Sequence, residues 1–237
     1  MAGREPSRKA AWNLFGSSAE LADALSTAVA RALRSAIQQR GTAFIAVSGG
    51  TTPGLFFRTL SGRKLDWGKV IVVLVDERFV ERGSPRANAG LVQANLLQNG
   101  ASAARFVDLY QPAPTVDEAA SASAKLFREL PWPLDVAVLG MGTDGHTASF
   151  FPDASNLTAL LDPASTEMVL PVHAASAGEP RLTLPLARLV DAGLLVLHIE
   201  GAEKRKVLEE TLATGSDLPV RSVLDRSRTQ VQVFWAP

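Results

Sequence analysis

The sequence comprises 237 residues without a cysteine, and its 24 lysines and arginines balance 24 aspartates and glutamates. The lack of cysteine excludes disulfides, cysteine-ligated metals and thiol nucleophiles, and the zero formal charge argues against a protein of nucleic acids or anionic membranes. The longest apolar runs, such as Val70–Val75, are far shorter than the ~18 residues that span a bilayer, and no signal peptide is visible. We therefore expect a cytoplasmic protein with no membrane and no nucleic acid among its partners.

The first predicted element is a helix with one buried stripe. Ser17-Ser18-Ala19-Glu20 matches a capping box, which marks a helix start. Apolar residues then recur every four positions from Leu21 to Ile37, and Gly41 ends the pattern.

A short apolar strand is predicted over residues 43–47, and it ends in Ser48-Gly49-Gly50-Thr51. Pro53 follows at a position typical of the first helical residue, which makes Thr52 the candidate N-cap. Backbone N–H groups of a glycine turn at a helix start can hold an anion, but the same pattern also makes an ordinary tight turn. It is not a Walker A loop, because the Gly-Lys-Ser/Thr ending is missing.

The next strand, residues 70–75, is apolar throughout, which is typical of a strand covered on both faces. It ends abruptly in Asp76-Glu77-Arg78, and a helix is predicted over residues 88–98. In the second half of the chain we expect a helix over 115–130, strands over 134–139 and 194–199, a helix over 202–213, and a closing edge strand over 231–235.

Strands that alternate with helices predict an α/β fold, with a mostly parallel sheet and helices on both faces. We expect one domain over residues 1–237, with residues 1–11 as a flexible N-terminal extension. Ligands of such sheets bind outside the carboxyl ends of the strands. Polar, charged and glycine residues gather at four such ends: 48–51, 76–78, 140–146 and 201–204.

Asp144 and His146 are the candidate catalytic pair. Residues 140–145 formally match the dinucleotide pattern G-x-G-x-x-G, but that pattern normally opens the first βαβ unit, and Asp144 would face the pyrophosphate. An aspartate two residues before a histidine can fix its tautomer, which leaves the other ring nitrogen as a general base.

Three cations are candidates for binding an anionic substrate. Arg78 can pair with a phosphate or carboxylate, Lys204 opens a helix at the shared edge, and Arg181 lies in a predicted loop. The other histidines, His173 and His198, are interpreted as structural, and the histidine spacing predicts no metal site. The sequence has no G-x-S-x-G motif, which argues against a serine esterase.

In their order, these motifs resemble the 6-phosphogluconolactonase family from about residue 12 to the C-terminus. The matching pieces are Ser48-Gly49-Gly50-Thr51-Thr52-Pro53, Asp76-Glu77-Arg78, Asn88, residues 140–149 with Phe151-Pro152, Pro180-Arg181-Leu182-Thr183, and Gly201-Ala202-Glu203-Lys204. The resemblance implies a modified Rossmann-type fold. It also implies hydrolysis of 6-phosphogluconolactone to 6-phosphogluconate, the second step of the oxidative pentose phosphate pathway, without a cofactor or metal.

The resemblance and the residue chemistry together give a set of expected roles. We expect His146 to act as general base and Asp144 to orient it. The expected substrate-binding residues are Gly49, Gly50, Thr51, Asp76, Arg78, Asn88, Gly145, Arg181 and Lys204. The expected partner is the sugar-phosphate lactone, and the expected state is a monomer or weak homodimer.

Two alternatives remain open. The related glucosamine-6-phosphate deaminases carry a catalytic glutamate five residues after the histidine, where this chain has Phe151. The second alternative is a non-catalytic sugar-phosphate sensor, since related folds serve as effector domains of transcription regulators. Such a sensor would need an attached DNA-binding module, and the roughly 15 residues before the first sheet unit are too few for a helix-turn-helix. Departures from the family pattern at Thr51, Glu81 and Ala87 put a substrate contact by residues 81–86 in doubt.

Overall fold

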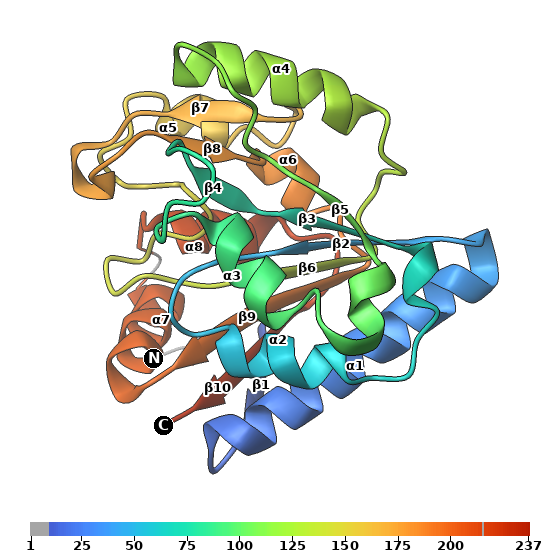
Figure 1. Ribbon diagram of the computed structural model, residues 1–237. Helices are drawn as coiled ribbons and strands as arrows, with labels where there is room; N and C mark the ends of the chain where they lie inside the picture. Colours follow the sequence, from blue (N-terminus) through green and yellow to red (C-terminus); the bar gives the residue numbers. More distant parts are fainter. Residues whose placement is uncertain (1–9, 215) are drawn as a thin grey trace, which may run out of the picture.

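A seven-stranded sheet forms the centre of the protein in a computed structural model that describes residues 10–214 and 216–237 (Figure 1). Every pair of neighbouring strands in it is parallel. In spatial order the strands are β1 (Ala10–Leu14), β10 (Val231–Ala236), β9 (Leu194–Glu200), β6 (Val136–Leu139), β2 (Ala43–Val47), β3 (Val70–Leu74) and β5 (Arg105–Val107).

A second, smaller sheet has three antiparallel strands in the order β4 (Asp76–Arg78), β8 (Arg181–Thr183) and β7 (Leu170–Val172). Strand β4 begins two residues after β3 ends, so the chain passes directly from the large sheet into the small one. The junction places the small sheet beside the carboxyl end of β3.

Helices cover both faces of the large sheet, as predicted. Figure 1 shows α1 and α2 on one side, and the small sheet with α4 and α6 on the other. The helices are α1 (Ser18–Arg40), α2 (Gly54–Ser61), α3 (Asn88–Asn95), α4 (Val116–Arg128), α5 (Leu157–Leu160), α6 (Leu186–Leu189), α7 (Ala202–Thr214) and α8 (Pro219–Arg226), with 3₁₀ turns η1 (Trp67–Lys69), η2 (Asn99–Ala103) and η3 (Ala175–Ala177).

Local sequence signals explain the long helix α1. The Ser17 hydroxyl accepts a hydrogen bond from the Glu20 N–H (3.2 Å), and Gly41 ends the helix in the left-handed conformation (φ 79°). The stripe that begins at Leu21 is buried against the sheet, where every residue of β2 is also buried. This confirms the predicted amphipathic helix and the short apolar strand predicted over residues 43–47.

The structure corrects four of the sequence predictions. Strand β10 is not an edge strand, because β1 pairs outside it, and the expected extension over residues 1–11 is wrong for residues 10 and 11. Residues 1–9 lie outside the described residues. Thr52 is not an N-cap, since α2 begins after Pro53 without a side-chain cap. The helix predicted over 88–98 ends at Asn95, because the Val92 carbonyl accepts from the N–H groups of both Leu96 and Leu97.

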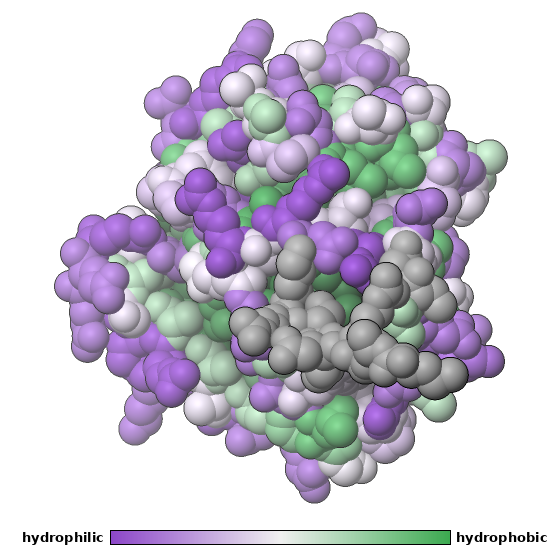
Figure 2. Space-filling model, turned by 180° about the vertical axis from the view of Figure 1, so that it is seen from behind, coloured by the Kyte–Doolittle hydropathy of each residue, from purple (hydrophilic) through white to green (hydrophobic). Residues whose placement is uncertain are grey.

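The surface seen from behind is mainly hydrophilic, with scattered apolar patches (Figure 2). Among residues 10–214 and 216–237, no helix combines the length and the apolar character that crossing a bilayer requires.

Candidate active site

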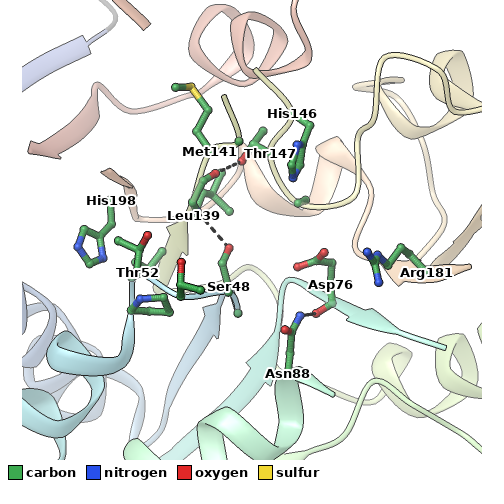
Figure 3. Close-up of a pocket in the computed structure, with 18 of the residues that line it drawn as sticks. Ser48, Thr52, Asp76, Asn88, Leu139, Met141, His146, Thr147, Arg181 and His198 are labelled. Carbon is green, nitrogen blue, oxygen red and sulfur yellow. Dashed lines mark hydrogen bonds between the residues drawn. The ribbon is translucent and has the colours of Figure 1, made fainter. Parts of the chain in front are cut away.

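A cleft of about 350 Å³ opens at the carboxyl ends of β2, β3, β6 and β9 (Figure 3). The predicted site residues that line it come from the loops after β2 and β6, from the small sheet, and from α3 and α7: Gly49, Gly50, Thr51, Asp76, Arg78, Asn88, His146, Arg181 and Lys204. Asp144 and Gly145 are the two predicted site residues that do not line it. The parallel strands therefore bring polar strand ends together, as the sequence predicted.

The predicted catalytic pair is in contact. His146 Nδ1 lies 2.5 Å from Asp144 Oδ1, and the same oxygen accepts from the His146 backbone N–H at 3.2 Å. An imidazole that carries its proton on Nδ1, against this carboxylate, presents the Nε2 lone pair as a base. Asp144 thus contacts His146 from outside the cleft lining.

Two glycines shape the turn that carries this pair. A Cβ on Gly142 would lie 2.3 Å from His146 Nδ1 and 2.4 Å from Asp144 Oδ1, so the pair leaves no room for a side chain there. Gly145 has φ +75° and packs against Leu218, whose nearest side-chain atom would lie 2.7 Å from an added Cβ. The Gly145 carbonyl also accepts from the Val220 N–H at 3.1 Å, so Gly145 packs against the start of α8 and does not line the cleft.

Phe151 supports the imidazole of His146. Its ring is buried and stacks on the His146 ring, with centroids 4.5 Å apart. The Arg181 guanidinium carbon lies 5.9 Å from the centroid of the same phenyl ring. The sequence indicated only that Phe151 stands where a deaminase has a glutamate, and it did not predict this packing.

At the Asp76 end of the cleft, hydrogen bonds and packing join residues of three segments. Asp76 Oδ2 accepts from the Ser149 hydroxyl at 2.6 Å, and Asn88 Nδ2 donates to the Asp76 carbonyl at 3.0 Å. The Asn88 amide packs directly on Gly49, because a Cβ there would lie 2.0 Å from Asn88 Oδ1. Gly49 and Asn88 are thus required for close packing at this end.

Glu77, which the sequence interpretation passed over, joins β4 to the start of α3. Its buried carboxylate accepts from the backbone N–H groups of Arg78 (2.6 Å), Asn88 (2.8 Å) and Ala89 (2.7 Å). It therefore replaces the cap that Ala87 cannot provide. Burial raises the pKa of the Glu77 carboxyl above its usual value, while the three backbone hydrogen bonds act in the opposite direction.

Replacing Glu77 with alanine should lower the free energy of unfolding by about 3 kcal/mol, because three backbone N–H groups, of which that of Asn88 is buried, lose their acceptor. A raised pKa means that the native state binds the Glu77 proton more tightly than the unfolded state, so this group's contribution to stability falls as pH rises from the unfolded towards the native pKa. Glu77→Gln lacks this titration, so its stability deficit should shrink with rising pH across that window.

Urea unfolding of both variants between pH 4 and 8 (roughly the range in which carboxyls with raised pKa titrate) measures these effects. Glu81→Gln, an exposed glutamate of the following loop, is the matched control. Equal stability of Glu77→Ala and Glu81→Gln would contradict the capping role.

The opposite end of the cleft is formed by Thr52, which follows the glycine turn, and by Lys204. Lys204 Nζ donates to Thr52 Oγ1 at 3.5 Å, and Gly50 adopts a positive φ of 91°. Figure 3 shows Thr52 and His198 on the side of the cleft away from His146 and Arg181. The Thr52 hydroxyl therefore faces the cleft, and the helix start is left uncapped.

His198 is buried in β9, in keeping with its structural interpretation, and it also lines the cleft. Its Nε2 lies 3.1 Å from Glu200 Oε1, and Glu200 Oε2 accepts from the Ser18 hydroxyl at 2.6 Å. The hydrogen bond with His198 is the main reason that the pKa of Glu200 is lowered, and Lys204 adds to the effect. The hydrogen bond with His198 thus holds the Glu200 carboxylate where it interacts with the charge of Lys204.

Arg181 is not a loop cation, because it lies in β8 with a buried side chain that lines the cleft. Residues 81–86 do not line the cleft, whereas the Arg86 carbonyl accepts from Arg78 Nη1 at 2.6 Å. In residues 10–214 and 216–237, no group of three or more acidic or histidine side chains is placed to hold a metal ion.

Comparison with known proteins gives a consistent match. The family model described as glucosamine-6-phosphate isomerases/6-phosphogluconolactonase matches residues 16–235. A protein of Mesorhizobium japonicum named 6-phosphogluconolactonase is 61% identical over 226 residues, 95% of each chain. One of Rhizobium meliloti with the same name is 51% identical over 95% of this chain and 98% of its own.

Solved structures agree with these relatives. The crystal structure of a 6-phosphogluconolactonase from Shewanella baltica superposes with a TM-score of 0.94 at 34% identity, covering 98% of this chain and all of that one. A structure described as a 6-phosphogluconolactonase from Neisseria gonorrhoeae gives a TM-score of 0.85, also at 34% identity, over 95% of this chain and 99% of the other. The chain therefore belongs to the glucosamine-6-phosphate isomerase/6-phosphogluconolactonase family.

Proposed function

We propose that the protein hydrolyses 6-phospho-D-glucono-1,5-lactone to 6-phospho-D-gluconate. The observation that carries the proposal is the Asp144–His146 pair at a cleft lined by Arg78, Arg181 and Lys204. A base beside several cations suits a substrate that is both an ester and a phosphate. The names of the relatives point to the same reaction.

In the proposed mechanism, His146 Nε2 removes a proton from a water molecule as the water oxygen attacks the lactone carbonyl carbon. Asp144 holds the imidazole and stabilises its positive charge. The tetrahedral intermediate then breaks the bond to the ring oxygen, which takes the proton back from His146. A positioned base of this kind contributes typically ~10²–10⁴-fold to the rate.

The remaining steps are binding of the phosphate and stabilisation of the negative charge on the carbonyl oxygen. The turn that includes Gly50 and Thr51 offers backbone N–H groups for the sugar phosphate, with Lys204 and Arg78 as cationic partners. The negative charge on the carbonyl oxygen needs a donor, for which Arg181 or a backbone N–H of the 140–146 turn is available.

Phe151 favours this reaction over the deaminase alternative. Deamination of a sugar phosphate needs additional acid–base groups for ring opening and for proton transfer at carbon. Phe151 places a phenyl ring against His146, where a glutamate of the deaminases would supply one of those groups. Hydrolysis needs a single activated water and no cofactor, so the partner in this proposal is the lactone itself.

Acid release from freshly generated 6-phosphogluconolactone tests the proposal. Because the lactone opens spontaneously, the rate with the protein must exceed that of a blank and must saturate with substrate. A rate equal to the blank, together with ammonia release from glucosamine 6-phosphate, would contradict the lactonase proposal and favour the deaminase. A lactonase result would also support, as a further part of the proposal, a place in the oxidative pentose phosphate pathway of the cytoplasm.

A further inference from the structure

Two arginines of the cleft face each other across the small sheet. The antiparallel register of β4 and β8 pairs Arg78 with Arg181, and both side chains line the cleft. Like charges at directly opposed positions of a sheet repel each other. Other groups must therefore fix the two guanidinium groups when no anion is bound.

Glu179 holds Arg181 in place. Arg181 Nη1 donates to Glu179 Oε1 at 2.7 Å, and Arg181 Nη2 donates to the Ala177 carbonyl at 2.7 Å. The Arg181 side chain is 8% exposed and that of Glu179 is 17% exposed, so water screens this pair little. The hydrogen bond from Arg181, aided by the charges of Arg181, Arg86 and Arg78, lowers the pKa of Glu179. Glu179 is therefore charged at neutral pH.

Arg86 connects the two arginines from outside the cleft. Its Nη1 donates to Glu179 Oε2 at 2.6 Å, and its backbone carbonyl accepts from Arg78 Nη1 at 2.6 Å. One residue of the β4–α3 loop thus contacts Arg78 directly and Arg181 through Glu179. Neither Glu179 nor Arg86 lines the cleft.

We propose that Glu179 and Arg86 are positioning residues that orient Arg181 and Arg78 for the anionic substrate before it binds. The inference rests on the proposed function, because it assigns the two arginines to a sugar-phosphate ligand. Orienting a cation in advance removes the ordering cost from the binding step, and small displacements of such groups cost large factors in rate.

The Glu179→Gln variant distinguishes a role of Glu179 in positioning Arg181 from a purely electrostatic effect of its negative charge. The substitution makes the cleft more positive, so long-range attraction alone would tighten the binding of an anion. Lost orientation of Arg181 has the opposite effect. We expect a Kd for 6-phosphogluconate at least about tenfold higher, and a kcat/KM for the lactone roughly 10–100-fold lower.

Arg86→Gln and Arg82→Gln form a matched pair of variants. Both arginines lie on the same loop with 62% exposed side chains, and both pair with a carboxylate, but Arg82 contacts Asp108 (3.6 Å) and not Glu179. We expect Arg86→Gln to raise the Kd for 6-phosphogluconate by up to about fivefold, as an exposed ion pair permits. Arg82→Gln should stay within about twofold of wild type, and Arg86→Lys should recover most of the affinity.

Calorimetric titration with 6-phosphogluconate, which requires no turnover, measures all these variants, and thermal unfolding monitors their fold. In the double variant, Arg86→Gln should add little to Glu179→Gln, because it acts through that carboxylate. Unchanged or tighter binding by Glu179→Gln, or equal effects of Arg86→Gln and Arg82→Gln, would overturn the inference while leaving an active wild type. Failure of the wild type to bind would instead overturn the proposed function, and this inference with it.

Discussion

His146→Ala is expected to lower kcat/KM for lactone hydrolysis by about 10²–10⁴-fold, the usual contribution of a positioned general base. The reason is that the variant keeps the cations of the cleft but loses the nitrogen that activates water. The binding of 6-phosphogluconate should change much less than the rate. Initial rates of acid release, corrected for spontaneous opening, measure the first effect, and calorimetry measures the second.

His173→Ala is the matched control for this variant. His173 has a 54% exposed side chain and lies 3.4 Å from Asp117 of α4, outside the cleft. It should retain the wild-type rate. A similar loss of rate in both histidine variants would mean that His146 has no special part in the chemistry.

Gly142→Ala should lower kcat/KM by about 10²-fold, although it adds only a methyl group, because displacements of about 1 Å in a catalytic geometry have effects of this size. The added Cβ would lie 2.3 Å from His146 Nδ1 and 2.4 Å from Asp144 Oδ1, far inside contact distance. One of the two side chains must therefore move, and their 2.5 Å contact is lost. The same rate assay checks this prediction, with the melting temperature showing that the fold persists.

Gly90→Ala is the matched control for Gly142→Ala, because it adds the same methyl group at a position with free space around it. An added Cβ at this position of α3 would meet no atom within 4 Å, and alanine favours helix over glycine. This control should keep full activity and at least wild-type stability. Wild-type activity in Gly142→Ala would show that contact between Asp144 and His146 is not needed for catalysis.

The elements that the sequence predicted well are those with local signals. The capping residue Ser17 accepts from the N–H group of Glu20, as its spacing predicted. The apolar strands of the parallel sheet were likewise visible, because burial on both faces leaves an uninterrupted apolar run. Their polar ends then placed most of the cleft residues.

The elements that the sequence did not predict depend on partners far along the chain. Strand β1 pairs with β10 at the other end of the sequence, so nothing near residues 10–14 indicated the pairing. Strands β4 and β8 have three residues each and pair across more than a hundred positions, which leaves no periodic pattern to recognise. For this reason the sequence alone predicts Asp76-Glu77-Arg78 as a strand end and Arg181 as a loop residue.

The supporting residues of the site were missed for the same reason. Glu77 alternates with Asp76 and Arg78, and a strand interpretation would have turned it away from the cleft, but its three N–H partners come from the fold. Phe151 and Glu179 act on His146 and Arg181 by contact, and residue type alone does not indicate such contacts.

The most direct test of the account follows proton release from freshly generated 6-phosphogluconolactone at constant pH with wild type, His146→Ala and no protein. The account predicts a fast, saturable reaction with wild type, and a His146→Ala trace close to the spontaneous one while the variant still binds 6-phosphogluconate. A His146→Ala trace that follows wild type would contradict the assignment of the base, and a wild-type trace that follows the blank would contradict the proposed function.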